Sequence, residues 1–402
     1  MPDTERPVAI LGTGLIGVSW TALFLHHGFD VQAWDRDPEA RDMLKERLKA
    51  PLAQLQQLGA GADRPGRLTV NSELTEVLSR AIFVQENAPE RLDVKHDLYR
   101  SFELHAEADA LIASSASGLP WSELSAQMDR PERLLNGHPY NPPHLVPLVE
   151  LFCPAEATLV RAEEIYRRIG RVPVRMKREA VGHLANRLAS ALWREAVHIV
   201  AEGIADVEAV DLALVNGPGL RWAVMGAHMT YHLGGGSGGL AHYLEHLGDS
   251  QEGRWRSLGT PKLTPELRAA LIAGVEAEAS GKSIAQLEQE RDAALMRILA
   301  RRSGSADSWA MCRLGSLAAK HRCTSFIECR HPFAAVFGGN GAIIGLDFHS
   351  QPIRQPQAAA APNRQLGLPH CNGRVGRYGG GGLERCGQQL FNWVNGIGET
   401  PV

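Results

Sequence analysis

The chain has 402 residues, of which 44% are hydrophobic and 22% are charged, and its formal net charge is −3. This composition is typical of a globular protein with two or three domains, and it argues against binding to nucleic acid. No run approaches the ~20 apolar residues needed to span a bilayer, and no apolar leader precedes the first predicted strand. We therefore expect a cytoplasmic protein that has no nucleic-acid or membrane partner.

The first predicted elements surround a glycine-rich loop. The apolar run 8–11 is typical of a buried parallel strand, and Gly12, Gly14 and Gly17 follow it with the spacing G-x-G-x-x-G. The glycines allow a tight turn, close approach of a pyrophosphate, and packing of the next helix on the strand. Asp35 ends a second predicted strand, where it would meet the adenosine ribose of NAD. This stretch predicts dinucleotide binding.

Strands and helices continue to alternate as far as about residue 178. Further strands are expected at 68–70, 81–85, 111–114, 134–138, 146–152 and 172–176, and helices at 38–58, 74–78 and 92–104. Pro51 lies within the first of these helices and is expected to kink or split it. The alternation predicts a doubly wound, Rossmann-type α/β domain over residues 1–178.

The pattern changes after residue 178 and again after residue 300. Helical segments are expected at 182–202, 207–215, 222–233, 239–247, 265–279 and 283–300, so residues 179–300 are predicted to form an all-α domain for substrate binding and dimerisation. Residues 301–402 show no hydrophobic period and are predicted to be a disordered or atypical tail.

The cysteines are concentrated in that tail. Cys153 stands alone among the first 300 residues, which argues against a disulfide framework there. Cys312, Cys323, Cys329, Cys371 and Cys386, with His331, match no zinc-module spacing, so we expect no metal site. A zinc site, a shifted reading frame and a degraded fused domain remain alternatives for the tail.

His138 is the strongest candidate for a catalytic base. It follows a predicted strand, at the carboxyl edge where doubly wound sheets bind ligands. Oxidation of an alcohol by NAD⁺ needs a base for the hydroxyl proton, and histidine suits this task because its ordinary pKa is about 6.5. Glu150 lies in the next predicted strand, within reach as a carboxylate partner. From the residues alone, a core histidine and a surface glutamate are an equal alternative.

Several motifs together resemble the 3-hydroxyacyl-CoA dehydrogenase family, and within it the branch of L-carnitine dehydrogenase and lambda-crystallin (L-gulonate 3-dehydrogenase). Besides the glycine loop with Asp35 and the acid Glu150, they are E-N-A-P-E-R at 86–91, S-S-A-S-G at 114–118, G-H-P-Y-N-P at 137–142 and G-H-L-A-N-R at 182–187. The resemblance covers about residues 7–300 and implies an NAD-dependent oxidoreductase acting on an L-3-hydroxy group.

The resemblance also implies roles for individual residues. His138 would be the general base and Glu150 its partner, Ser117 would form a hydrogen bond with the substrate hydroxyl, and Asn186 would help to hold the substrate oxygen. The alternative for Ser117 and Asn186 is a turn residue and a helix-start residue. The predicted cofactor contacts are Gly12, Gly14, Leu15, Ile16, Gly17, Asp35, Arg36, Glu86, in a loop near the nicotinamide, and Arg91.

The substrate is less well defined by the residues. In the family that the sequence resembles, members that use a coenzyme A thioester carry lysines in the segment after the second strand, whereas residues 54–66 here contain only Arg64 and no lysine, which argues against that substrate. Trp193 and Trp222 offer aromatic faces for a trimethylammonium group, and Arg221 offers a partner for a carboxylate. Together with Asn141 they complete the predicted substrate contacts, and the lean is towards a small free 3-hydroxy acid such as L-carnitine. The alternatives are that the tryptophans pack in the core or a dimer interface, that the substrate is a CoA thioester, or that the protein is a crystallin-like NAD-binding protein without activity.

Overall fold

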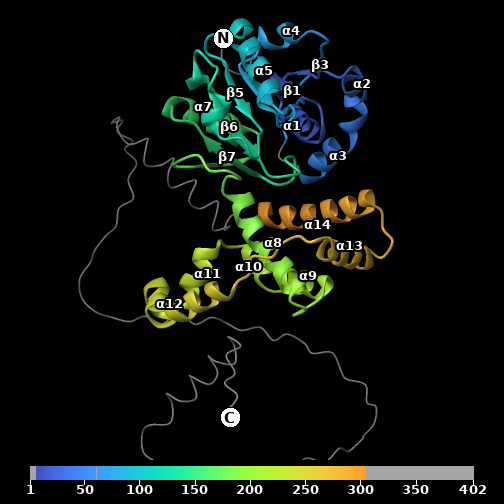
Figure 1. Cartoon of the computed structure of the whole chain (residues 1–402). Helices are drawn as coiled ribbons and strands as arrows, with labels where there is room; N and C mark the ends of the chain where they lie inside the picture. Colours follow the sequence, from blue (N-terminus) through green and yellow to red (C-terminus); the bar gives the residue numbers. More distant parts are fainter. Residues whose placement is uncertain (1–5, 60, 305–402) are drawn as a thin grey trace, which may run out of the picture. The chain divides into compact units, whose positions relative to one another are not determined.

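The computed structural model describes residues 6–59 and 61–304, and its first part is built on an eight-stranded sheet (Figure 1). The strand order is β3-β2-β1-β4-β5-β6-β7-β8. All neighbouring strands are parallel except β6 and β7, which are antiparallel. The strands are β1 (Val8–Leu11), β2 (Val31–Trp34), β3 (Leu68–Val70), β4 (Phe83–Glu86), β5 (Leu111–Ser114), β6 (Leu134–Pro139), β7 (Leu148–Phe152) and β8 (Val172–Arg175). The predicted Rossmann-type fold class is confirmed, and the order reverses between β1 and β4, where such sheets bind ligands.

Helices cover both faces of the sheet, and each face has its own apolar core. One core contains Trp20, Phe24 and Tyr166, and the other contains Tyr99 and Phe102. The helices of this part are α1 (Leu15–His26), α2 (Pro38–Arg47), α3 (Lys49–Leu58), α4 (Leu74–Leu78), α5 (Leu92–His105), α6 (Trp121–Leu124) and α7 (Glu156–Arg168), with a 3₁₀ turn at Pro131–Arg133. Members of α1, α2, α3 and α7 belong to the first core, and members of α4, α5 and α6 to the second.

In the second part of the chain, all regular elements among the described residues are helical. They are α8 (Ala185–Ala201), α9 (Val207–Asn216), α10 (Pro218–Trp222), α11 (Ala227–Gly234), α12 (Gly239–Ser257), α13 (Pro265–Ala279) and α14 (Ile284–Gly304), with a 3₁₀ turn at Gly236–Gly238. The starts follow local rules: Asp206 caps α9, and Thr264 caps α13 just before Pro265, the first residue of that helix. Few apolar side chains are buried here, whereas many large ones are exposed.

Several predicted boundaries differ from the structure. The helix expected at 38–58 breaks at Leu48, three residues before Pro51, because proline is tolerated in the first turn of a new helix. The segment expected as one helix at 222–233 is divided into α10 and α11, and α12 extends ten residues beyond the predicted end at residue 247. Helix α7 was not predicted, although its buried side chains pack on the sheet. The proposed tail 301–402 and its cysteines lie almost entirely outside the described residues. Among the described helices, none is long and apolar enough to cross a membrane.

Candidate active site

The glycine loop joins β1 to α1 and leaves room for a ligand against its backbone. Gly12 has a φ of +86°, which favours glycine, and a side chain at Gly17 would place its Cβ 1.9 Å from the Gly12 carbonyl oxygen. The loop can therefore lie close to the start of α1, whose free N–H groups and positive dipole end attract phosphate. The described geometry fits the pyrophosphate of a dinucleotide.

Asp35 lines a cavity of about 830 Å³, which Gly12 and Gly14 also line. Its Oδ2 atom accepts hydrogen bonds from the Thr13 backbone N–H at 2.6 Å and the Thr13 hydroxyl at 3.2 Å. Arg36 and Arg91 also line this cavity. The arrangement provides a carboxylate for ribose hydroxyls, as an adenosine site requires.

The predicted pair of His138 and Glu150 is formed in the structure. The residues stand opposite each other in the antiparallel register of β6 and β7, and His138 Nδ1 lies 2.9 Å from Glu150 Oε2. The other carboxylate oxygen accepts the backbone N–H groups of Leu184 at 2.7 Å and Ala185 at 2.8 Å, at the start of α8. Burial raises the pKa of Glu150, but these hydrogen bonds outweigh burial and leave that pKa lowered. The ionised carboxylate holds the hydrogen on Nδ1, so Nε2 is left as the basic nitrogen.

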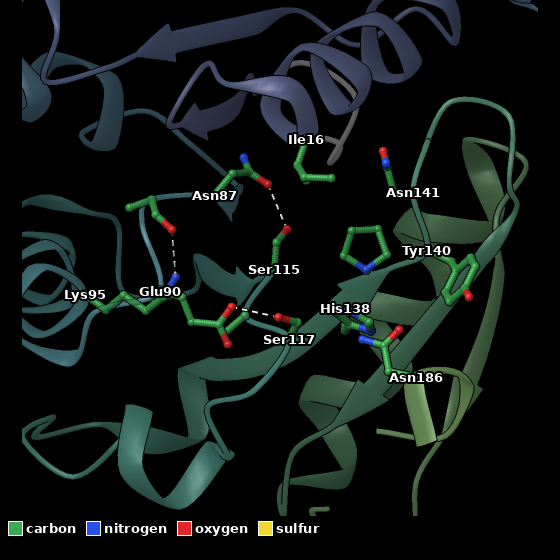
Figure 2. A pocket seen from close by; sticks show the side chains of 13 residues that line it. Ile16, Asn87, Glu90, Lys95, Ser115, Ser117, His138, Tyr140, Asn141 and Asn186 are labelled. Atoms are coloured by element: carbon green, nitrogen blue, oxygen red, sulfur yellow. Dashed lines mark hydrogen bonds between the residues drawn. The ribbon is translucent and has the colours of Figure 1, made fainter. Parts of the chain in front are cut away.

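A cavity of about 480 Å³ is lined by His138 and by two of the other predicted catalytic residues, Ser117 and Asn186 (Figure 2). Ser117, Asn141 and Asn186 line it, as does Ile16 from the start of α1. Figure 2 shows Asn186 beside His138, and Ile16 on the opposite side of the cavity. The cavity therefore brings the glycine-loop helix and the base to one space, as removal of a hydride from a carbon and of a proton from the hydroxyl on that carbon requires.

Glu90 is a cavity residue that the sequence reasoning missed. It lies in the loop after β4, and its Oε2 accepts a hydrogen bond from the Ser117 hydroxyl at 2.7 Å while Oε1 accepts the Gly118 N–H. Burial raises the pKa of Glu90, but the bonds from Ser117 and Gly118 and the charge of Lys95 leave it lowered. The cavity thus contains an ionised carboxylate.

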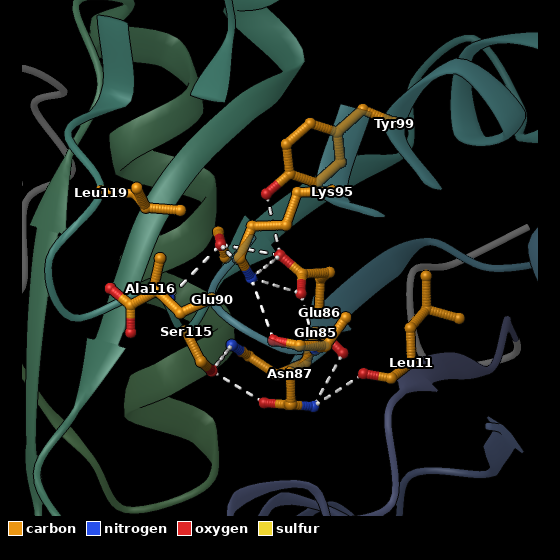
Figure 3. A network of polar contacts seen from close by, with 12 residues as sticks. Leu11, Gln85, Glu86, Asn87, Glu90, Lys95, Tyr99, Ser115, Ala116 and Leu119 are labelled. Atoms are coloured by element: carbon orange, nitrogen blue, oxygen red, sulfur yellow. Dashed lines mark hydrogen bonds and ion pairs between the residues drawn. The ribbon is translucent and has the colours of Figure 1, made fainter. Parts of the chain in front are cut away.

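Glu86 ends β4 rather than lying in the loop, and it is completely buried. Its carboxylate accepts from Lys95 Nζ at 2.7 and 2.9 Å, from the Tyr99 hydroxyl at 2.8 Å and from the Ser114 hydroxyl at 2.7 Å (Figure 3). The prediction of Glu86 in the nicotinamide loop is therefore corrected: its oxygens are used within the protein, and Glu90 is the glutamate that lines the cavity. Lys95, which also lines the cavity, has its charge compensated by Glu86.

Asn87 and Ser115 were also missed, and they connect the cavity to the glycine loop. The Ser115 hydroxyl donates to Asn87 Oδ1 at 2.7 Å and accepts from Gln85 Nε2 at 2.9 Å. Asn87 Nδ2 in turn donates to the Leu11 carbonyl at 3.3 Å, just before Gly12 (Figure 3). The loop beneath the phosphate site is thereby tied to the strands that carry the cavity.

Comparison with known proteins identifies the family. The 3-hydroxyacyl-CoA dehydrogenase NAD-binding domain matches residues 7–180, and the 3-hydroxyacyl-CoA dehydrogenase C-terminal domain matches residues 182–269. The chain belongs to the 3-hydroxyacyl-CoA dehydrogenase family. It is thus an NAD-dependent oxidoreductase that acts on CH–OH donors, and the cofactor predicted from the glycine loop is confirmed.

The relatives in this family are similar over most of the described chain. An L-carnitine dehydrogenase from Streptomyces griseus is 45% identical over 74% of this chain and 90% of its own length. An L-carnitine dehydrogenase from Bacillus cereus is 38% identical, over 74% and 92%. Among solved structures, FHMPC 5-dehydrogenase, described as an NAD⁺-dependent dismutase, has a TM-score of 0.64 and 27% identity, and covers 74% of this chain and 99% of its own.

The predicted catalytic and substrate-binding residues of this chain do not all line one cavity. The 480 Å³ cavity includes Ser117, His138, Asn141 and Asn186, with Glu150 directly behind His138. Trp193 on α8 and Arg221 and Trp222 on α10 are not among its lining residues. Their role in substrate binding remains a prediction.

Proposed function

We propose that this enzyme oxidises the L-3-hydroxy group of a small free acid, with L-carnitine as the first candidate. The observation that supports the reaction is the 2.9 Å contact between His138 Nδ1 and Glu150, which leaves the other ring nitrogen basic in a cavity shared with Ser117 and Asn186. The glycine loop and Asp35 would hold NAD⁺, which would supply the acceptor for the hydride from the hydroxyl-bearing carbon of the substrate.

The protein groups handle the proton and the oxygen. His138 Nε2 removes the hydroxyl proton as the carbon–oxygen double bond forms, and the resulting imidazolium is stabilised by the Glu150 carboxylate. Asn186 would hold the substrate oxygen as it becomes a ketone, and Ser117, whose hydroxyl hydrogen is donated to Glu90, lines the same cavity. One proton and one hydride leave the alcohol, so the product is the 3-keto acid.

Two observations favour a free acid over a CoA thioester. The L-carnitine dehydrogenases similar to this chain are 38% to 45% identical to it. Among the described residues that line the 480 Å³ cavity, the cation Lys95 is already paired with Glu86, whereas a thioester needs cations for its phosphates. The ionised Glu90 suits a quaternary ammonium group instead.

A substrate panel tests the proposal. NADH formation would be followed with L-carnitine, D-carnitine, L-gulonate, 3-hydroxybutyrate and 3-hydroxybutyryl-CoA, with His138→Asn as the background control. We expect the highest kcat/KM for L-carnitine and little turnover of its D enantiomer. A clear preference for 3-hydroxybutyryl-CoA would overturn the proposed substrate, and no turnover of any substrate would favour a non-catalytic, crystallin-like role.

We also propose that a second copy covers the helical part. Several large apolar side chains of the helical part are exposed by 60% or more: Leu188, Trp193, Leu220 and Trp255. Burial of apolar surface stabilises a protein by about 25 cal/mol per Å², so these side chains would gain free energy from being covered. Such a face is typical of an obligate dimer interface. Sedimentation of the purified protein should give the mass of two chains, and Leu188→Arg should shift it towards one. A wild-type monomer would contradict this proposal.

The cytoplasm remains the proposed location, in agreement with the free, buried Cys153 thiol.

A further inference from the structure

His183 has an unusual backbone for a residue with a side chain. Its φ is +47°, in the left-handed region, and it follows Gly182 with a φ of +75°. Its side chain is buried, with 2% of the residue exposed. Strained conformations of this kind persist only where the surroundings determine them, and they are concentrated at functional sites.

The strained backbone places the His183 ring against the ring of His138. The two ring centroids are 4.6 Å apart and the planes are inclined by 27°, which is a stacked arrangement. His183 Nε2 donates a hydrogen bond to the Ala116 carbonyl oxygen at 3.0 Å. His183 Nδ1 is buried and has no hydrogen-bond partner among the described residues. The contacts therefore suit a neutral ring, because a second N–H would have no acceptor.

The electrostatic surroundings agree with a neutral His183. Burial is the largest influence and lowers the pKa of His183, and a positive charge on His138 lowers it further. The Ala116 carbonyl and the carboxylates of Glu150 and Glu90 oppose these effects but do not outweigh them. His183 thus stays uncharged while its neighbour changes charge.

We propose that His183 is a positioning residue for the general base: its neutral ring holds the His138 ring flat and offers an aromatic face to the imidazolium that forms during oxidation. This inference rests on the proposed role of His138. A cation is attracted to a neutral aromatic face, whereas a second charged ring would repel it. This role accounts for both unusual features of His183. The left-handed backbone places the ring against His138, and the absence of a partner for Nδ1 in the described part of the chain keeps the ring neutral.

The stack should affect the proton affinity of the base. Loss of the aromatic face would move the acidic limb of the pH profile for alcohol oxidation to lower pH by about half to one pH unit, since one unit corresponds to the strength of a partly buried cation–π contact. A less well held ring should also reduce kcat roughly tenfold.

Three substitutions separate the ring from the backbone. His183→Asn tolerates the left-handed backbone but has no ring. His183→Phe retains a ring under backbone strain, and His183→Leu has the same strain without a ring. If the asparagine variant does not fold, the comparison of phenylalanine with leucine still isolates the aromatic face.

The readouts are the pH dependence of kcat/KM with the best substrate of the panel, and the pKa of His138 from proton NMR of imidazole C–H signals, which needs no substrate. We expect the asparagine and leucine variants to show the shift and the phenylalanine variant to retain the wild-type value. Wild-type values in the asparagine and leucine variants, or an equal shift in all three, would overturn the inference. His138→Asn is measured in parallel: if it keeps wild-type turnover, the proposed function fails, and if it is inactive while His183→Asn is unchanged, only the present inference fails.

Discussion

The carboxylate of Glu150 has three hydrogen-bond donors around it, and this number makes Glu150→Gln a sharp test. Oε2 accepts from His138, and Oε1 accepts from the amides of Leu184 and Ala185. Glutamine has one oxygen and one NH₂ group, so it cannot serve both sides. With its oxygen towards the two amides, its NH₂ faces His138 Nδ1, which must then accept. The ring hydrogen moves to Nε2, and the nitrogen in the cavity is no longer basic.

The magnitude follows from this exchange of the ring hydrogen. A base in the wrong tautomer loses its contribution as an acid–base group, which is about 10²- to 10⁴-fold in kcat. The opposite amide orientation is worse for stability, because it directs the NH₂ group at the two partly buried backbone N–H donors and costs about 1–3 kcal/mol. We therefore expect the first orientation, with a large loss of kcat and little loss of NAD⁺ affinity.

The assay measures kcat by NADH absorbance and the affinity for NAD⁺ by calorimetry. Glu163→Gln is the matched control, since Glu163 is a mostly buried glutamate whose partners are Arg167 and Arg175, outside the 480 Å³ cavity. It should leave kcat unchanged. Turnover of Glu150→Gln within about threefold of wild type would refute the argument that Glu150 sets the tautomer of the base.

Three further outcomes are expected. Gly17→Ala should abolish NAD⁺ binding in calorimetry, because its Cβ would clash with the Gly12 carbonyl, whereas normal affinity would show that the loop can open. Asp35→Ala should weaken NAD⁺ binding more than it reduces kcat. It should also reduce the expected preference for NAD⁺ over NADP⁺, because the Asp35 carboxylate would repel the 2′-phosphate of NADP⁺; an unchanged cofactor preference in steady-state kinetics would argue against the ribose contact. His144 is buried, which lowers its pKa to about 4 from 6.5, so its stabilising contribution is complete above pH 6.5 and is lost, by up to ~3 kcal/mol, as pH falls towards 4. Urea unfolding at pH 7 and pH 4.5 should therefore show a smaller loss of stability in His144→Gln than in wild type, and equal losses would contradict this.

The sequence predicted those parts of the site that depend on local spacing. The glycine loop and Asp35 follow rules of one strand–helix–strand unit, and the structure places them as expected around one cavity. The residues alone left the pairing of His138 with Glu150 and a structural role as equal alternatives, and the resemblance to the family decided between them; the antiparallel register of β6 and β7 places the two residues opposite each other. Their hydrogen bond, however, had to be seen in the structure.

The missed residues depend on information that a linear sequence does not carry. Glu86 and Glu90 are four positions apart, and only the end of β4 decides which of them is buried and which lines the cavity. Lys95 reads as a surface cation of an amphipathic helix, yet it is 1% exposed because Glu86 lies beneath it. His183 acquires its place through a left-handed backbone and a contact with Ala116, 67 residues earlier.

The hydrogen bonds from the start of α8 to Glu150 also have a consequence for how activity arises in a newly made chain. The dinucleotide loop joins β1 to α1 within the sheet-containing part, whereas the amides that hold the Glu150 carboxylate come from Leu184 and Ala185, where the helical part begins. In a partly folded molecule with only its sheet-containing part formed, the glycine loop for the phosphates is present, but the Glu150 carboxylate lacks the two amides that hold it. We therefore expect efficient proton removal to need both parts of the chain, because the sheet-containing part alone lacks the two amides that hold the Glu150 carboxylate.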